Sequence, residues 1–264
     1  MENNHNKVYD FELGKLYALW LREFKVFLRE KSRLVAAIFT PLLWLFVFGG
    51  GLGSSLSGFS NNSNINYQEF IFPGIICMSV IFSSVFFGSY IIWDKKFDFL
   101  KSVMVGPVDR STIFIGKTLG GMTTSIIQAF ILLLIGVFLG IHYTPVSILL
   151  ITVIVLLLSF ALTSLGLAIG SFMESLEGFQ LIVSFVVFPL YFLSGALFPL
   201  KNIPQWLLIL TSIDPATYAV EALRATMLDI SGRNPFALNI VLLALSTIIL
   251  GIIGIACFRK MKAI

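Results

Sequence analysis

A run of 56 consecutive residues between Lys117 and Glu174 contains no Asp, Glu, Lys or Arg. At about 20 residues for each helical crossing of a bilayer, this run has room for two membrane spans and a turn. Four further charge-free stretches have room for one span each, and they cover residues 34–68, 70–93, 178–200 and 234–258. The sequence therefore predicts an all-α polytopic membrane protein with six transmembrane helices.

Composition supports lipid as the solvent for most of this chain. Charged residues make up 12% of the 264 residues, whereas a soluble domain carries about 25%. The two cysteines, Cys77 and Cys257, lie in different apolar stretches and support neither a disulfide framework nor a cysteine metal site. The net charge of +4 reflects basic residues beside the spans, so we expect no nucleic-acid partner.

The charge pattern also divides the chain into two parts. Residues 1–33 are expected to form a tail and an amphipathic helix on the membrane surface, with basic residues opposite its apolar face. That face carries Leu13, Leu16, Tyr17, Trp20, Phe24, Phe27 and Leu28. A membrane anchor and a docking surface for a cytoplasmic partner both remain open for this helix. Residues 34–261 form the expected transmembrane domain, with spans at about 34–51, 70–93, 119–139, 146–172, 179–198 and 236–258.

Two connections and three glycine pairs add detail. The Gly/Ser/Asn stretch at 53–66 predicts a solvated loop, and residues 94–110 predict a charged loop with one short helix. Glycines four residues apart favour close approach of helices in a membrane. The pairs are Gly116/Gly120, Gly136/Gly140 and Gly166/Gly170.

Residues 199–235 are too apolar for an ordinary loop and too interrupted by proline for a span. They predict a re-entrant or interfacial hairpin of two short helices, one from Pro204 and one from Asp214-Pro215, with Asp214 as N-cap. Glu221 and Arg224, three residues apart, are predicted to pair, either as an interfacial ion pair or at the border of an exit path. The candidate outer gate consists of Asp214, Tyr218, Glu221 and Arg224.

Basic residues are distributed unequally between the two sides of the predicted membrane protein. The tail and first helix, the loop between spans two and three, and the C-terminus together carry 15 of the 18 Lys and Arg residues. Basic residues concentrate on the cytoplasmic side of membrane proteins. Both termini are therefore predicted to be cytoplasmic, and the 199–235 hairpin to be outside.

The predicted span centres contain no ionisable residue for a proton relay. Gly116-Lys117-Thr118 resembles the end of a phosphate-binding loop, but the required earlier glycine is replaced by Ser111. No catalytic, cofactor-binding or metal-ligating set is recognisable in the sequence. We therefore expect a non-enzymatic subunit that takes energy from a partner. The alternatives are an ion-driven secondary carrier or channel and, less supported, a membrane enzyme or scaffold.

Three motifs carry a family resemblance. They are MVGPVDR at 104–110 followed by Gly116-Lys117, FLSGALFPL at 192–200, and IDPATYAVEALR at 213–224. With six spans behind an amphipathic helix, the chain resembles the permeases of type-2 ABC exporters, in the branch of daunorubicin-resistance and nodulation-factor export. Members of that family often carry Asn where this chain has Asp214.

This resemblance implies a half-transporter in the cell membrane of a prokaryote. It implies two copies of a separate ABC ATPase, which bind ATP and Mg²⁺, and a second permease copy in a homodimer or a sister heterodimer. The implied cargo is drug-like, lipid or glycolipid. The resemblance also implies ATPase coupling through the first helix and the second-to-third loop, with Tyr17, Arg22, Lys25, Arg29, Lys95, Asp98, Lys101 and Arg110 as candidates. The acidic turn at Glu174 and Glu177 is a further candidate, and the 199–235 hairpin is expected to shape the exit.

Overall fold

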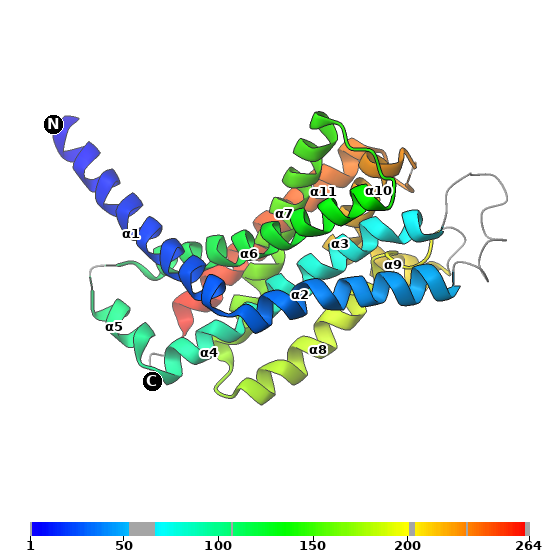
Figure 1. The fold of residues 1–264 in the computed structure, drawn as a ribbon. Helices are drawn as coiled ribbons and strands as arrows, with labels where there is room; N and C mark the ends of the chain where they lie inside the picture. The colour runs from blue at the N-terminus through cyan, green and yellow to red at the C-terminus, as the bar shows by residue number, and fades with distance from the viewer. Residues whose placement is uncertain (1, 53–66, 107, 201–203, 231, 262–264) are drawn as a thin grey trace.

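The computed structural model describes residues 2–52, 67–106, 108–200, 204–230 and 232–261, and every regular element within them is helical (Figure 1). In chain order these elements are α1 (Glu2–Arg29), α2 (Lys31–Trp44), the π-helical η1 (Leu45–Leu52), α3 (Tyr67–Phe86), α4 (Ser89–Lys96), α5 (Phe99–Val105), α6 (Arg110–Phe138), α7 (Pro145–Phe172), α8 (Leu176–Leu193), α9 (Gln205–Ile213), α10 (Pro215–Leu228) and α11 (Phe236–Lys260). The predicted loop at 53–66 lies outside the described residues.

Within the described residues, five helical stretches are long and apolar enough to cross a membrane. They are Tyr67–Lys96, which joins α3 and α4, Arg110–Phe138, Pro145–Phe172, Leu176–Leu193 and Phe236–Lys260. The first predicted span corresponds to α2 and η1, where the apolar helix Ile38–Gly51 is shorter than the others. Pro41 lies inside this helix, and the backbone widens into η1 four residues later. The count of six spans stays a prediction for this reason.

Helix α3 lies at the centre of the assembly and packs against α6, α7, α8 and α10. Thirteen of its twenty residues are buried. Its sequence is apolar on every face, and a helix of that kind is stable only when other helices or lipid surround it. The largest cluster of buried side chains forms around it and includes Phe72, Ile76 and Leu158.

Glycines bring α7 into backbone contact with the junction of α3 and α4. A Cβ atom at Gly88, in this junction, would collide with the backbone carbonyl of Gly166, and one at Gly166 would collide with that of Val85. Gly170 faces the Gly88 carbonyl in the same way. The close approach predicted from the Gly166/Gly170 pair is therefore confirmed. Gly140, in contrast, has a φ of +83° just after α6 and serves a turn.

Helix α1 buries one stripe against α6 and leaves part of its predicted apolar face uncovered by protein. Leu13, Tyr17 and Leu28 of the predicted apolar face are 63%, 59% and 50% exposed. The side that packs against α6 carries Leu19, Glu23 and Phe27, and of these only Phe27 belongs to the predicted apolar face. Glycines on α6 explain this choice, because Gly116 and Gly120 leave space directly opposite Leu19 and Glu23.

The start of α1 and the end of α11 lie at the same end of the helix assembly as α5, whereas α9 and α10 lie toward the other end (Figure 1). Within the described residues, the segments that carry most of the basic residues thus share one end of the molecule.

Candidate functional site

Four charged side chains meet where α1, α4 and α6 converge. The Lys117 ammonium on α6 donates to the Glu23 carboxylate on α1 at 3.0 Å and also to the Asp94 carboxylate on α4. The Arg22 guanidinium on α1 donates to Asp94 at 2.6 Å and to Glu23 at 2.6 Å. Each cation therefore bridges both anions. We call these four residues the ion-pair cluster.

The ion-pair cluster is largely closed to solvent. The Glu23, Asp94 and Lys117 side chains are only 2%, 6% and 0% exposed. Arg22 is the outermost member, and its guanidinium stacks on the Phe99 ring of α5 at 3.6 Å. Burial disfavours the charged form of Arg22, but hydrogen bonds and attraction from Asp94 and Glu23 outweigh it and raise the pKa of Arg22. The cluster therefore holds a charged Arg22 and joins the N-terminal helix to two helices of the bundle.

This cluster corrects the sequence analysis on two points. Asp94 lies in α4 rather than in a charged loop, and α6 begins at Arg110, nine residues before the span predicted from residue 119. Lys117 therefore lies two turns inside α6, although the sequence analysis placed it just before the third span. A lysine does not have to end a helical span when buried carboxylates neutralise it.

Two further residues of the predicted coupling loop bind the ends of other helices. The Lys95 ammonium donates to the Ser171 carbonyl at 2.6 Å and to the Gly170 and Met173 carbonyls at 3.4 Å, at the end of α7. The Arg110 guanidinium donates to the Arg259 carbonyl at 2.5 Å and the Met261 carbonyl at 2.9 Å, at the end of α11. Terminal carbonyls of a helix lack partners inside the helix, so these cations act as C-terminal caps.

The other predicted coupling residues lie apart from the ion-pair cluster. Tyr17, Lys25 and Arg29 are exposed on α1. Asp98 and Lys101 form an exposed ion pair at 2.9 Å beside α5. The same end of the molecule exposes Phe97 and Val105, which are 71% and 90% exposed and flank α5. Glu174 and Glu177 are also exposed.

Sequence reasoning missed three members of the cluster as candidate site residues, namely Glu23, Asp94 and Lys117. One signal was present for Glu23, because it sits between Leu19 and Phe27 at helical spacing of four residues. An acidic side chain within a buried helical stripe requires a cationic partner. No comparable local pattern marks that partner, which lies 94 residues away in the sequence.

The predicted N-cap of α10 is confirmed. The Asp214 carboxylate accepts a hydrogen bond from the Ala216 amide at 2.8 Å, and Pro215 occupies the first turn. Burial raises the pKa of Asp214 to about 8, although the bonds from Ala216 and Thr217 oppose this shift. The Tyr218 hydroxyl donates to the Ser212 carbonyl at 2.5 Å, which ties α10 to the end of α9.

The predicted pairing of Glu221 with Arg224 is wrong. Both side chains are buried, and each takes partners from another segment. Arg224 donates to the Gly195 and Ala196 carbonyls at 3.1 and 3.3 Å, and its guanidinium lies 3.9 Å from the centre of the Phe70 ring. The Glu221 carboxylate accepts from the Asn239 amide group of α11 at 3.2 Å and from the Asn234 backbone amide at 3.3 Å. Segments packed on both sides of α10 thus replace the local ion pair.

Within the described ranges, the His, Cys, Asp and Glu side chains form no group of three or more that could hold a metal ion.

Comparison with known proteins gives one consistent family. Residues 14–228 match the family of ABC-2 type transporters. The chain is 29% identical over 263 residues to a putative transport permease ycf38 of Cyanophora paradoxa, covering 95% of this chain and 89% of that protein. It is 28% identical to the inner membrane transport permease YadH of Escherichia coli strain K12, covering 82% and 84%.

An ABC transporter G family member 20 of Dictyostelium discoideum is 32% identical over 171 residues, which cover 63% of this chain and 23% of that longer protein. Membership of this family implies association with an ABC ATPase subunit. The chain belongs to the ABC-2 type transporter family and is a multi-pass membrane permease.

Proposed function

We propose that this chain is the membrane-spanning permease subunit of an ATP-driven exporter. A separate ATPase subunit binds ATP and Mg²⁺, and its closure moves the helices of the permease so that cargo is released on the outer side. The ion-pair cluster carries this proposal, because Arg22, Glu23, Asp94 and Lys117 join α1, α4 and α6 into one mechanical unit. The Lys95 and Arg110 caps extend that unit to α7 and α11.

The surface around α5 is the proposed docking site for the ATPase. Phe97 and Val105 are exposed apolar side chains at an end of the molecule that is otherwise rich in charge. Apolar side chains rimmed by charged ones are typical of protein-binding surfaces. A push on α5 would reach α4 directly and, through Asp94 and Lys95, also α1, α6 and α7.

The same surface supports a proposed orientation of the chain in the membrane, and the assembly is proposed with it. The end that carries α5 is proposed to face the cytoplasm with both chain termini, in the cell membrane of a prokaryote, because basic residues favour that side. Two ATPase subunits and two permease subunits complete the transporter. The second permease is a copy of this chain or a sister chain.

The cargo is proposed to be a drug-like, lipid or glycolipid molecule, as in the daunorubicin-resistance and nodulation-factor export branch. The motifs at 192–200 and 213–224 carry this narrower assignment. They touch one another in the structure, since Arg224 of the second motif donates to Gly195 and Ala196 of the first. This contact supports a shared role for the two motifs at the exit.

Co-expression with a candidate ABC ATPase tests the proposal. We expect the permease and the ATPase to purify together, and ATP hydrolysis to require the ATPase. Val105→Asp should abolish the association, because it would bury an unpaired carboxylate in the interface. Substrate movement into inverted vesicles that depends on an ion gradient, with no need for ATP, would contradict the proposal and favour an ion-driven carrier.

A matched pair of aspartates isolates the charge at the docking site. Asp98 and Asp229 are both exposed and both adopt positive φ, at 54° and 53°. Asn tolerates this backbone conformation, so Asp98→Asn and Asp229→Asn remove a charge without backbone strain. We expect only Asp98→Asn to weaken ATPase binding, because Asp229 ends α10 at the other end of the molecule. Reversal of Arg110 is less informative, since it also removes the cap of α11.

A further inference from the structure

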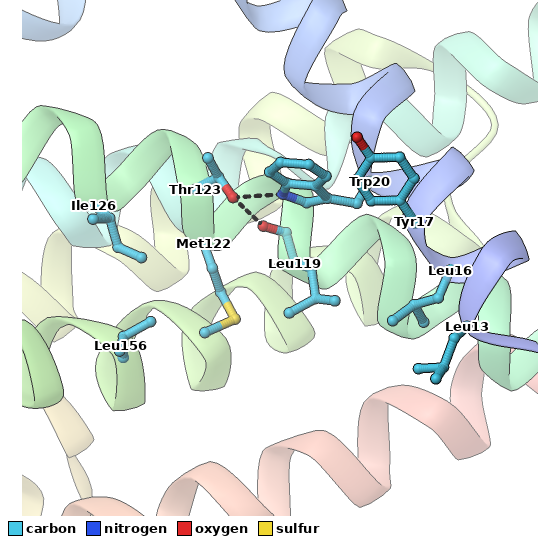
Figure 2. Close-up of a pocket in the computed structure, with 9 residues that line it drawn as sticks. All are labelled: Leu13, Leu16, Tyr17, Trp20, Leu119, Met122, Thr123, Ile126 and Leu156. Carbon is cyan, nitrogen blue, oxygen red and sulfur yellow. Dashed lines mark hydrogen bonds between the residues drawn. The ribbon is translucent and has the colours of Figure 1, made fainter. Parts of the chain in front are cut away.

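A pocket of about 440 Å³ lies where α1 leaves the helix bundle. Figure 2 shows its walls, which come from α1, α6 and α7. The lining residues are Leu13, Leu16, Tyr17 and Trp20 of α1, Leu119, Met122, Thr123 and Ile126 of α6, and Leu156 of α7. Its volume falls in the range of about 300–1,000 Å³ that is usual for small-molecule sites.

The pocket offers apolar contact and requires no hydrogen bond from an occupant. Its indole donor is already used, since Trp20 Nε1 donates to Thr123 Oγ1 at 2.8 Å. The Thr123 hydroxyl in turn donates to the Leu119 carbonyl at 2.8 Å. Figure 2 shows both bonds along one wall, with the remaining side chains hydrocarbon in character apart from the Tyr17 hydroxyl and the Met122 sulfur. A flexible hydrocarbon chain therefore matches this chemistry, because it brings no polar group that would lose its hydration.

The surroundings of the pocket indicate where it lies relative to the membrane. On α6, the face that lines the pocket continues through Phe130 and Val137, which are 39% and 55% exposed. On α7, the face of Leu156 continues through Leu149 and Val153, which are 65% and 39% exposed. Both helices are candidate membrane spans. The pocket thus opens onto a surface that the hydrocarbon of a bilayer would cover.

The charges of α1 place the pocket close to the edge of the membrane. Lys25 and Arg29 are exposed further along α1 and are rotated around the helix axis away from Leu13 and Tyr17. A helix of this kind lies in the interface with its basic side toward water and phospholipid headgroups. Tyr and Trp side chains also concentrate at this depth. The pocket under Tyr17 and Trp20 therefore lies at the level of the upper acyl chain.

We propose that this pocket binds an acyl chain of a phospholipid from the leaflet in which α1 lies. The acyl chain would occupy the space between α1 and α6 and keep these two helices apart at the pocket. A second copy of this chain is the competing occupant, but it would have to insert a protruding apolar segment into a concave site. The proposal concerns a lipid site in the permease and does not depend on the transported cargo or on the ATPase.

Photo-crosslinking tests the site in the full-length chain. The protein is reconstituted into vesicles of phosphatidylcholine and phosphatidylglycerol that contain a trace of phosphatidylcholine with a diazirine in one acyl chain. After illumination, mass spectrometry of peptides measures the lipid attached to residues 13–20 and 119–126. Met122→Trp fills the pocket, whereas Leu134→Trp adds the same side chain on an exposed part of α6 outside it.

We expect Met122→Trp to lower labelling of these two segments about tenfold, because it displaces the burial of roughly two methylene groups. Leu134→Trp should leave this labelling unchanged. Leu156→Phe, from the α7 wall, provides a second filling variant should Met122→Trp fail to fold. Equal labelling in the filled and control variants would show annular lipid contact only and would overturn the proposal. Crosslinks between two copies through residues 13–20, in place of lipid, would also overturn it.

Discussion

The Lys117 ammonium lies 3.0 Å from the Glu23 carboxylate, and both side chains are shielded from solvent, with 0% and 2% exposure. The two residues are 94 positions apart and belong to α6 and to the N-terminal helix α1. Their contact ties the C-terminal half of α1 to the helix bundle.

Replacing Lys117 should destabilise the fold strongly. Lys117→Met would leave the buried Glu23 and Asp94 carboxylates with Arg22 as their one cation, and breaking a buried ion pair costs about 3–5 kcal/mol. Reversible denaturation in mixed micelles measures the free energy of unfolding. Lys101→Met removes an exposed ion-pair partner and should change this free energy by less than about 0.5 kcal/mol.

A double-mutant cycle checks that the charges act together. Adding Asp94→Asn to Lys117→Met removes one of the stranded carboxylates, so the double variant should cost at least about 1 kcal/mol less than the sum of the two single variants. If the free-energy changes of the two single variants add up to that of the double variant, Lys117 and Asp94 do not interact energetically.

Lys95 and Lys96 are adjacent and should respond differently to the same change. Lys95→Met removes the donor to three carbonyls at the end of α7, whereas the Lys96 ammonium lies over the Trp93 ring on the surface. We expect Lys95→Met to lower the free energy of unfolding by about 1 kcal/mol, the value of a half-exposed charged hydrogen bond. Amide hydrogen exchange in the last turn of α7 should accelerate in this variant only. Identical exchange in both variants would rule out the capping role.

Gly166 should not tolerate a methyl group. Gly166→Ala would place a Cβ atom against the Val85 carbonyl, so α7 would have to move away from α3 at a cost of about 1–3 kcal/mol. Gly14, on the exposed part of α1, has open space around it. Gly14→Ala should therefore be neutral or stabilise its helix by up to about 1 kcal/mol. The same denaturation assay compares the two, and equal effects would argue against the tight contact of α7 with α3.

Asp214 should make stability depend on pH. Burial raises the pKa of its carboxyl from 3.8 to about 8 in the folded protein, so unfolding at a pH between these values releases a proton. Stability should accordingly fall as pH rises from about 4 to 8. Asp214→Asn keeps the cap acceptor without the ionisable group and should lose this slope. Asp214→Ala removes the cap acceptor, so it should lower the free energy of unfolding by about 1 kcal/mol relative to Asp214→Asn at every pH. Parallel pH profiles for the wild type and Asp214→Asn would contradict a raised pKa.

Local signals in the sequence predicted several elements well. Asp214-Pro215 marks a helix start, and the structure begins α10 at this proline with Asp214 as its N-cap; the span predicted from about residue 146 begins one residue earlier, at Pro145 of α7. Each signal acts through backbone groups two or three residues away, so a single sequence contains all of the necessary information.

Local sequence signals of this kind could not predict contacts between distant segments. Glu221 and Arg224 have ideal spacing for a pair on one helix, yet the Asn239 amide and the Gly195 carbonyl satisfy them instead. Lys117 marked the edge of a charge-free run and was therefore placed outside the third span. Its partners lie 23 and 94 residues away, and no spacing rule connects them.

The ion-pair cluster contains two cations, Arg22 and Lys117, and two anions, Glu23 and Asp94. A membrane potential performs work on a charge that crosses it, at about 2.3 kcal/mol per elementary charge for each 100 mV. When the four residues move together, the work on the cations cancels the work on the anions. A joint translation of the cluster within the electric field of an energised membrane therefore carries no net charge across it, so these four residues add no gating charge to the movement of α1.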